Sequence, residues 1–165
     1  IQNNLTIIME IKLIAIGKTD RTELEQLIKS YQNRLMHYVR FSIEIIPDIK
    51  NSKNLPEKKQ KEKEGEQILK KLSNSDLVIL LDENGSEMNS IKFSNFLQKQ
   101  MNSGLKRLVL VIGGPYGFSQ EVYNKSFTKL ALSKMTFSHQ MVRLFVIEQL
   151  YRGFSILKNE PYHHR

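Results

Sequence analysis

The sequence has no cysteine and no long hydrophobic run. Without cysteine, the chain can form neither a disulfide scaffold nor a thiolate zinc site, and it has no cysteine nucleophile. This composition fits a reducing compartment, so we expect a cytoplasmic protein. The longest strictly aliphatic runs have five residues, at 77–81 and 108–112, whereas a membrane-spanning helix needs about 20 apolar residues. We therefore expect no contact with a membrane.

Glycine and proline are also scarce. The 8 glycines and 4 prolines stand in a chain of 165 residues that is 40% hydrophobic, which is typical of a globular protein. This length predicts about one domain. Lysine and arginine number 25 against 17 acidic residues, which gives a net charge of +8. Such a charge favours a polyanionic partner such as RNA, but it carries no information about a reaction.

Met9 begins the first clear strand pattern. Residues 1–8 are apolar only in part, and no basic residue precedes their short apolar run, so they do not fit a signal peptide. We interpret residues 1–8 as an upstream extension and residues 9–165 as a single domain.

Strand and helix patterns alternate along the domain. The expected strands span 9–16, 41–46, 76–81, 108–112 and 127–133. The expected helices run from Asp20 or Thr22 to about 40, over 56–72 and 91–101, shortly after Ser119, and over 139–157. The fully apolar 108–112 is typical of a parallel strand covered on both faces. The order predicts an α/β fold with a mostly parallel sheet and helices on both faces.

Lysine and glutamate alternate in the first half of the 56–72 helix, with no apolar stripe. One interpretation is a solvated helix carrying ion pairs. The other is a basic surface for nucleic acid, which the small local net charge weakens.

Ligands of parallel sheets bind at the carboxyl ends of the strands, so the loops after Leu81, Ile112 and Leu132 are the candidate site. The sequence Gly113-Gly114-Pro115-Tyr116-Gly117 fits neither a dinucleotide fingerprint nor a phosphate-binding P-loop. Its paired glycines would let a ligand approach the main chain closely. The alternative is a tight turn without function.

The segment 132–139 mixes hydroxyl, lysine and histidine side chains with Met135 and Phe137. This mixture suits a pocket for a ligand that has both an apolar and a polar part. The alternative is a core-packing loop in which His139 caps the following helix.

The 139–157 helix is apolar around most of its circumference, so we expect one face on the sheet and another on a partner. A symmetric homodimer is the simplest partner. Glu148 and Arg152 are four residues apart and can form an ion pair; Arg143 and Arg152 could instead contact phosphate. The tail, with Tyr162 and His163, could stack on and bind RNA, or it could be a frayed end.

The order and identity of several motifs resemble the ribosomal large subunit pseudouridine methyltransferase H family, a bacterial branch of the knotted SPOUT methyltransferases. The resemblance covers Met9 to the C-terminus. It rests on MEIKLIAIGK at 9–18, EKEG at 62–65, IGGPYG at 112–117, LSKMTF at 132–137 followed by His139 and Gln140, EQLYR at 148–152 and PYH at 161–163. Departures are residues 1–8 and Ser138, where the family often has proline.

The resemblance implies a C-terminal trefoil knot, an exception to the usual unknotted topology, and a homodimer. It implies transfer of a methyl group from S-adenosylmethionine to N3 of a pseudouridine in 23S rRNA of assembled ribosomes. It further implies that the tail of one subunit completes the active site of the other. The implied cofactor-binding residues are Leu81, Gly113, Leu132, Ser133, Lys134, Met135, Thr136 and Phe137.

For the chemistry, His139 or His163 is the candidate base that takes the N3 proton. Arg143 or Arg152 could stabilise the developing anion or hold a phosphate. The candidate RNA-binding residues are Arg143, Arg152, Tyr162 and His163. We expect no metal, although Asp82 and Glu83 are adjacent carboxylates. The alternatives are a non-catalytic RNA-binding or ribosome-associated module and a SPOUT methyltransferase for another RNA.

Overall fold

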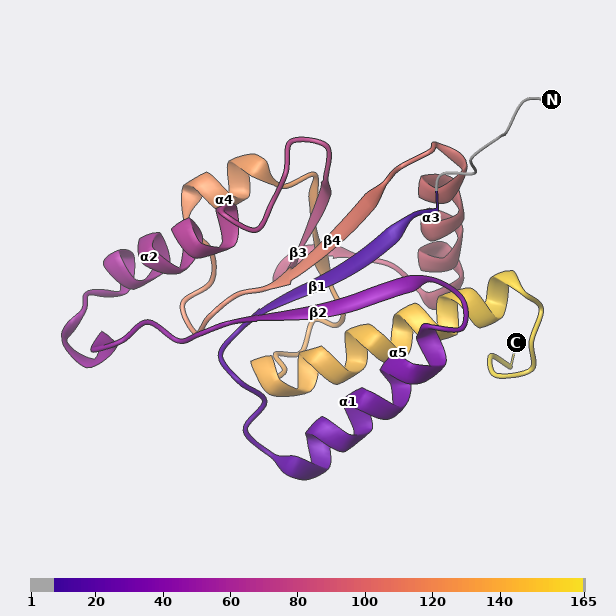
Figure 1. Ribbon diagram of the computed structural model, residues 1–165, viewed down its shortest axis with the longest axis horizontal. Helices are drawn as coiled ribbons and strands as arrows, with labels where there is room; N and C mark the ends of the chain where they lie inside the picture. Colours follow the sequence, from indigo (N-terminus) through magenta and orange to yellow (C-terminus); the bar gives the residue numbers. More distant parts are fainter. Residues whose placement is uncertain (1–7, 165) are drawn as a thin grey trace.

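A five-stranded sheet, in which every strand pairing is parallel, runs through the centre of the protein (Figure 1). The computed structural model describes residues 8–164. The sheet has the order β2-β1-β4-β3-β5. Its strands are β1 (Glu10–Ile16), β2 (Arg40–Ile46), β3 (Leu77–Glu87), β4 (Arg107–Ile112) and β5 (Thr128–Ala131). The helices are α1 (Thr22–Leu35), η1 (Ser52–Asn54, a 3-10 turn), α2 (Glu57–Leu69), α3 (Ser90–Asn102), α4 (Gln120–Lys125) and α5 (His139–Leu157).

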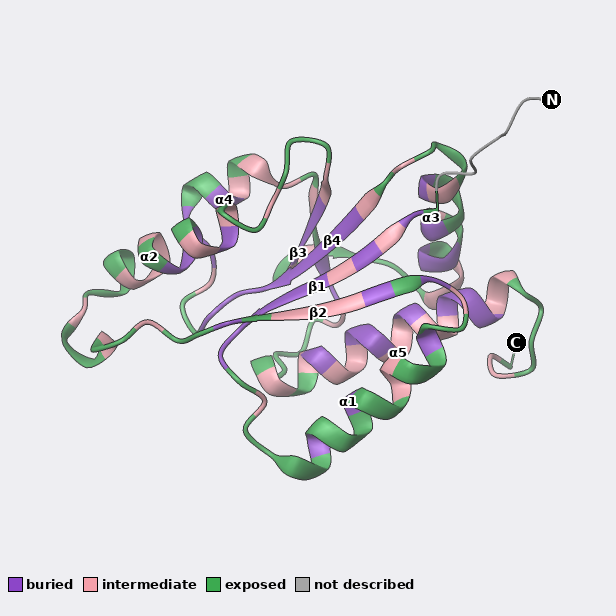
Figure 2. Ribbon diagram, in the orientation of Figure 1, coloured by how far each residue is buried: buried purple, intermediate pink, exposed green. Residues whose placement is uncertain are grey.

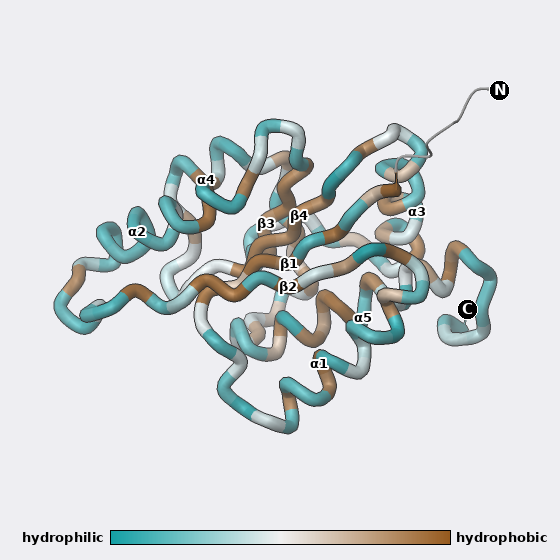
Figure 3. The backbone as a smooth tube through the Cα atoms, viewed as in Figure 1, coloured by the Kyte–Doolittle hydropathy of each residue, from teal (hydrophilic) through white to brown (hydrophobic). Residues whose placement is uncertain are grey.

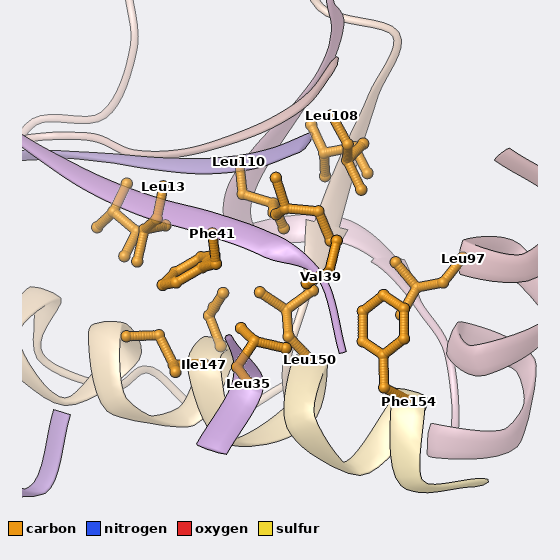
Figure 4. Close-up of a cluster of buried hydrophobic side chains, with 14 of the residues drawn as sticks. Leu13, Leu35, Val39, Phe41, Leu97, Leu108, Leu110, Ile147, Leu150 and Phe154 are labelled. Carbon is orange, nitrogen blue, oxygen red and sulfur yellow. The ribbon is translucent and has the colours of Figure 1, made fainter. Parts of the chain in front are cut away.

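Alternating side chains of the strands face two separate cores. On one face, residues such as Leu13 and Leu110 pack on α1, α3 and α5, and Figure 4 shows them opposite Ile147 and Leu150. On the other face, residues such as Val111 pack on α2 and α4. The predicted α/β fold with helices on both faces is therefore confirmed.

The central strands are the most apolar part of the chain (Figure 3). All five residues of 108–112 are buried, as expected for a strand covered on both faces, and Figure 2 shows this burial. The part of the chain that the structure describes contains no helix long and apolar enough to cross a membrane.

Helix α5 lies against both α1 and α3 on one face of the sheet (Figure 1). Phe154 of α5, for example, stacks on Tyr38, which follows α1. Helices α1 and α3 therefore cover the two flanks of α5, and cover by a second copy stays a prediction. The homodimer itself and the trefoil knot stay predictions.

Three predicted element ends differ from the structure by three residues or more. Helix α1 ends at Leu35 rather than near residue 40, because Arg40 already begins β2, and α2 ends at Leu69 rather than 72. Strand β3 continues to Glu87 and pairs with β5 on both sides of an irregularity between Leu81 and Ser86. A Cβ at Gly85 would lie 2.6 Å from the main-chain carbon of Lys129, so glycine permits this close pairing.

Candidate active site

A cavity of about 360 Å³ opens beside residues 81–84 of β3 and at the carboxyl ends of β4 and β5. Each of the three loops predicted from the topology contributes to its wall. The lining residues include 81–84, 112–118, 132, 133, 135–137 and His139. Of the eight implied cofactor-binding residues, all except Lys134 line the cavity. The structure thus brings together most of a set that is scattered over more than 50 residues of sequence.

The glycine loop presents main chain to the cavity. A Cβ at Gly113 would lie 3.0 Å from the Phe118 ring, and one at Gly114 would lie 2.4 Å from Glu64 Oε2. Gly117 has a φ of +82° and donates its N–H to the Gly114 carbonyl over 3.2 Å. The tight turn is therefore present, and the loop also borders the cavity; the close approach of a ligand to its main chain stays a prediction.

The 132–137 segment forms an opposite wall with exposed apolar side chains. Met135 is 75% exposed and Phe137 37% exposed, and the Phe137 ring lies 5.1 Å from that of Phe145. Ser133 Oγ accepts the main-chain N–H of Met135 at 3.0 Å, and the Thr136 hydroxyl donates to the Glu83 carboxylate. The wall therefore offers apolar surface beside polar groups, as predicted for this segment.

Acidic side chains line the β3 side of the cavity. Asp82 accepts from the Tyr123 hydroxyl at 2.7 Å and from the Asn84 N–H at 2.9 Å. Burial, followed by the Asp82 bond and charge, raises the pKa of Tyr123 to about 12, so this hydroxyl stays a donor. Within residues 8–164, no group of three His, Cys, Asp or Glu side chains could hold a metal ion.

His139 is the one catalytic candidate that lines the cavity. The predicted alternative, in which His139 caps α5, is wrong, since Ser138 is the cap and its Oγ accepts the Met141 N–H at 3.2 Å. Desolvation, followed by the charge of Arg143, lowers the pKa of His139. The imidazole is therefore neutral near pH 7 and able to accept a proton.

Arg143 is buried, with 2% of its surface exposed. Its Nη2 donates to the Ile16 carbonyl at 2.8 Å, and its Nη1 donates to Thr19 Oγ1 at 3.3 Å. In this geometry the guanidinium reaches neither the cavity wall nor a surface on which RNA could lie.

The other candidates meet on the second half of α5. This tail cluster consists of Glu148, Arg152, Tyr162 and His163. Arg152 bonds Glu148 at 2.8 Å and His163 Nδ1 at 3.2 Å, and the Tyr162 hydroxyl donates to Glu148 at 2.9 Å. The predicted Glu148–Arg152 ion pair is therefore confirmed. The tail is packed, not frayed, because Tyr162 also contacts the Tyr151 ring at 4.7 Å.

The structure separates His139 from the tail cluster. Arg152 is 13 positions after His139 on α5, a rise of about 20 Å along a helix. In Figure 1, α5 begins near the carboxyl ends of the strands and runs back toward their other ends. One copy of the chain therefore holds the cavity and the tail cluster at different places.

Two residues beside the cavity escaped the sequence interpretation. Tyr123 bonds Asp82 across 41 residues, and no local pattern marks it. Glu64 packs on Gly114, although its helix reads as solvated. The available signal was the Glu64-Gly65 pair, because glycine within a charged helix indicates close packing.

Comparison with known proteins agrees with this geometry. A family described as a predicted SPOUT methyltransferase matches residues 9–163. Proteins named ribosomal RNA large subunit methyltransferase H are 66% identical in Christiangramia forsetii and 67% in Flavobacterium psychrophilum, each over 95% of this chain and 100% of the relative. A probable methylase family protein from Haemophilus influenzae shares the fold, with a TM-score of 0.50 and 15% identity over 98% of this chain and 72% of its own. The chain belongs to the SPOUT methyltransferase family.

Proposed function

We propose that this SPOUT methyltransferase transfers a methyl group from S-adenosylmethionine to N3 of a pseudouridine in 23S rRNA. The observation that carries the proposal is one cavity that is lined together by residues 81–84 of β3, the loop after β4 and the segment after β5. The name shared by relatives at 66–67% identity supports ribosomal RNA of the large subunit as substrate. Because that substrate is ribosomal, we propose a cytoplasmic site of action.

The residues of the cavity fit the cofactor. Leu81, Leu132 and Phe137 supply apolar surface, and the bare main chain at Gly113 allows close approach. The carboxylates of Asp82 and Glu83 also line the cavity, and their negative charge would favour the binding of a cation. When bound there, S-adenosylmethionine supplies a reactive methyl sulfonium, so most of the protein's contribution is to position the acceptor nitrogen.

The proton of N3 must leave as the new carbon–nitrogen bond forms and the sulfur–methyl bond breaks. His139 is the base candidate within the chain that holds the cavity, and its lowered pKa keeps it unprotonated near pH 7. His163 and Arg152 belong to the tail cluster and could act only from a second copy. We therefore propose a homodimer in which the tail cluster of one subunit faces the cavity of its partner.

A transfer assay with methyl-labelled S-adenosylmethionine tests this function. The substrates are intact ribosomes, free 23S rRNA and tRNA, with nucleoside analysis of the labelled RNA. We expect label in ribosomal 23S rRNA as N3-methylpseudouridine. Preferential labelling of tRNA would assign another RNA. Absence of calorimetric binding at millimolar S-adenosylmethionine would instead favour a non-catalytic RNA-binding module.

A further inference from the structure

Two adjacent residues of α2, Glu64 and Gly65, contact opposite ends of the loop that follows β4. A Cβ at Gly114 would lie only 2.4 Å from Oε2 of the Glu64 carboxyl. A Cβ at Gly65 would lie 2.3 Å from Ser119 Oγ. The 113–119 loop is therefore held between these two contacts, on the face of the sheet that α2 and α4 cover.

Glu64 is an unusual group for such a position. Only 3% of its surface is exposed. Oε1 accepts from Gln60 Nε2 at 3.1 Å, whereas Oε2 is buried without a hydrogen-bond partner in the described residues. Within residues 8–164, no basic side chain lies within 4.0 Å to form a salt bridge with it. Buried unpartnered carboxyl oxygens are rare and costly, so their presence requires a reason.

The surroundings favour a neutral carboxyl. Burial, although opposed by the Gln60 bond, raises the pKa of Glu64, and the charge of Asp48 acts in the same direction. Its hydrogen-bond partner, Gln60, is uncharged. Glu64 is therefore suited to packing and local bonding next to the Gly114 main chain, and not to pairing with a cation.

Gly65 allows this close approach. Because it lacks a Cβ, α2 can contact Ser119, whose Oγ accepts the Val122 N–H at 3.4 Å and caps α4. Glu64 is not among the residues that line the cavity, whereas Gly113 and Gly114 are. Contact from α2 thus reaches the loop from behind, on the side away from the cavity.

We propose that Glu64 is a positioning residue for the cofactor, which fixes the Gly113–Gly114 main chain from behind and thereby sets the affinity for S-adenosylmethionine. The inference rests on the proposed function. Since Glu64 touches neither cofactor nor acceptor, its loss lowers the fraction of molecules in which the 113–119 loop has the shape that binds the cofactor. Cofactor affinity therefore depends on Glu64, while turnover at saturating cofactor does not.

The test compares Glu64→Ala, Glu64→Gln and the control Glu66→Ala, an exposed glutamate on the same helix. For Glu64→Ala we expect the calorimetric Kd for S-adenosylmethionine to rise about tenfold, because the buried packing that holds the loop is lost. Its kcat at saturating cofactor stays within about twofold of the parent. Glu64→Gln keeps the shape and the bond to Gln60, so it restores most of the affinity, and Glu66→Ala matches the parent.

Hydrogen exchange gives a readout that does not depend on activity. Without cofactor, the main-chain amides of Gly113, Gly114 and 116–118 exchange faster in Glu64→Ala than in Glu66→Ala, whereas those of β1 are unchanged. If Glu64→Ala does not fold, Gln60→Ala replaces it, because it removes the hydrogen bond from Gln60 Nε2 to Glu64 Oε1 and leaves the carboxyl; we then expect a smaller change in the same direction.

The outcomes separate this inference from the proposed function. If the parent protein binds and uses S-adenosylmethionine but the folded Glu64 or Gln60 variant matches Glu66→Ala in Kd and in exchange, the positioning role is wrong. A fall in kcat at an unchanged Kd also overturns it. If the parent itself does not bind the cofactor, the proposed function fails, while exchange still reports whether Glu64 holds the loop.

Discussion

Arg143 Nη2 donates to the main-chain carbonyl of Ile16 over 2.8 Å, and both residues are buried. This bond joins the first half of α5 to the end of β1. Gln140 makes two hydrogen bonds to the loop that follows β1: it donates to the Lys18 carbonyl and accepts the Asp20 N–H, each at 3.1 Å. The beginning of α5, which carries His139, is therefore fixed to the sheet by polar contacts.

Replacing Arg143 with alanine should destabilise the fold. The change leaves the buried Ile16 carbonyl without its donor and creates a cavity, so we expect the free energy of unfolding to fall by about 2–4 kcal/mol. Urea denaturation measures the change. Arg21→Ala, at an exposed position, should stay within about 0.5 kcal/mol of the parent. Equal stability of the two variants would show that the buried guanidinium is not structural.

A valine at Gly113 should strongly weaken cofactor binding. A Cβ at this position would lie 3.0 Å from the Phe118 ring. Valine would add two further methyl groups at the surface that the cofactor would approach. We expect the Kd for S-adenosylmethionine to rise by about a hundredfold or more in calorimetry. The control is Gly104→Asn, because nothing lies within 4 Å of a Cβ there and asparagine tolerates the φ of +76°. Undiminished binding by Gly113→Val would place the cofactor elsewhere.

The rate of methyl transfer should fall at low pH through protonation of His139. Its pKa lies below the ordinary value of about 6.5, chiefly because of desolvation and then because of Arg143. The base is therefore unprotonated at pH 7, and the rate decreases as pH falls through the lowered pKa. His139→Gln should lower the single-turnover rate by about 100-fold or more and remove this acidic limb. An unchanged rate would exclude His139 as the base.

The half-buried pair of Asp76 and Arg107 should make stability depend on acid pH. Asp76 accepts from Arg107 Nε at 2.8 Å and Nη2 at 2.6 Å. Burial acts to raise the pKa of Asp76, but the bonds from Arg107 and Ser73 outweigh it and lower the pKa. The stabilisation is thus complete above the ordinary pKa and is lost as pH falls through the lowered one.

Asp76→Asn should therefore lower the free energy of unfolding at pH 7 by about 2–3 kcal/mol. The difference in this free energy between variant and parent should become smaller as the pH falls into the strongly acidic range. Denaturation at a series of pH values measures it. Glu66→Gln, an exposed acid outside such a pair, is the matched control. A difference that stays constant across the acid range would contradict the linkage to Asp76.

Mixed dimers should recover activity from two inactive variants. Gly113→Val lacks a usable cavity, and a chain shortened by residues 161–165 lacks the end of the tail cluster. If sites are shared between subunits, half of the randomly assembled dimers are mixed and each holds one complete site of two, so about a quarter of the parent activity returns. Dimers that contain only one of the two variants should show no activity. Absence of recovery, despite mixed dimers in native mass spectrometry, would confine each site to one chain.

The sheet and the cavity walls were accessible to sequence reasoning because their signals are local. The apolar run 108–112 identifies a covered parallel strand, and the glycines that follow it identify a loop at the carboxyl end. The element ends were less accessible: β3 passes Leu81 because it pairs again with β5, and no local pattern encodes that pairing.

The candidate polar residues were harder to sort. Arg143 and Arg152 are both arginines on one helix, yet one is buried against Ile16 and the other bonds Glu148 and His163. Arg143 contacts a residue more than 120 positions away in the sequence, and Arg152 contacts one about 10 positions away. Only the folded chain defines these contacts. Burial of Glu64 within a lysine-rich helix likewise depends on the loop it meets.

The place of α5 between α1 and α3 has a consequence for biosynthesis. Helix α5 is made after every strand, so the sheet face that it covers stays open to solvent while the earlier segments emerge from the ribosome. The nascent chain must therefore keep Leu13, Leu110 and their neighbours from associating with other proteins until α5 arrives. Completion of this core thus requires a long-range docking event, which should make synthesis of the protein sensitive to chaperone supply.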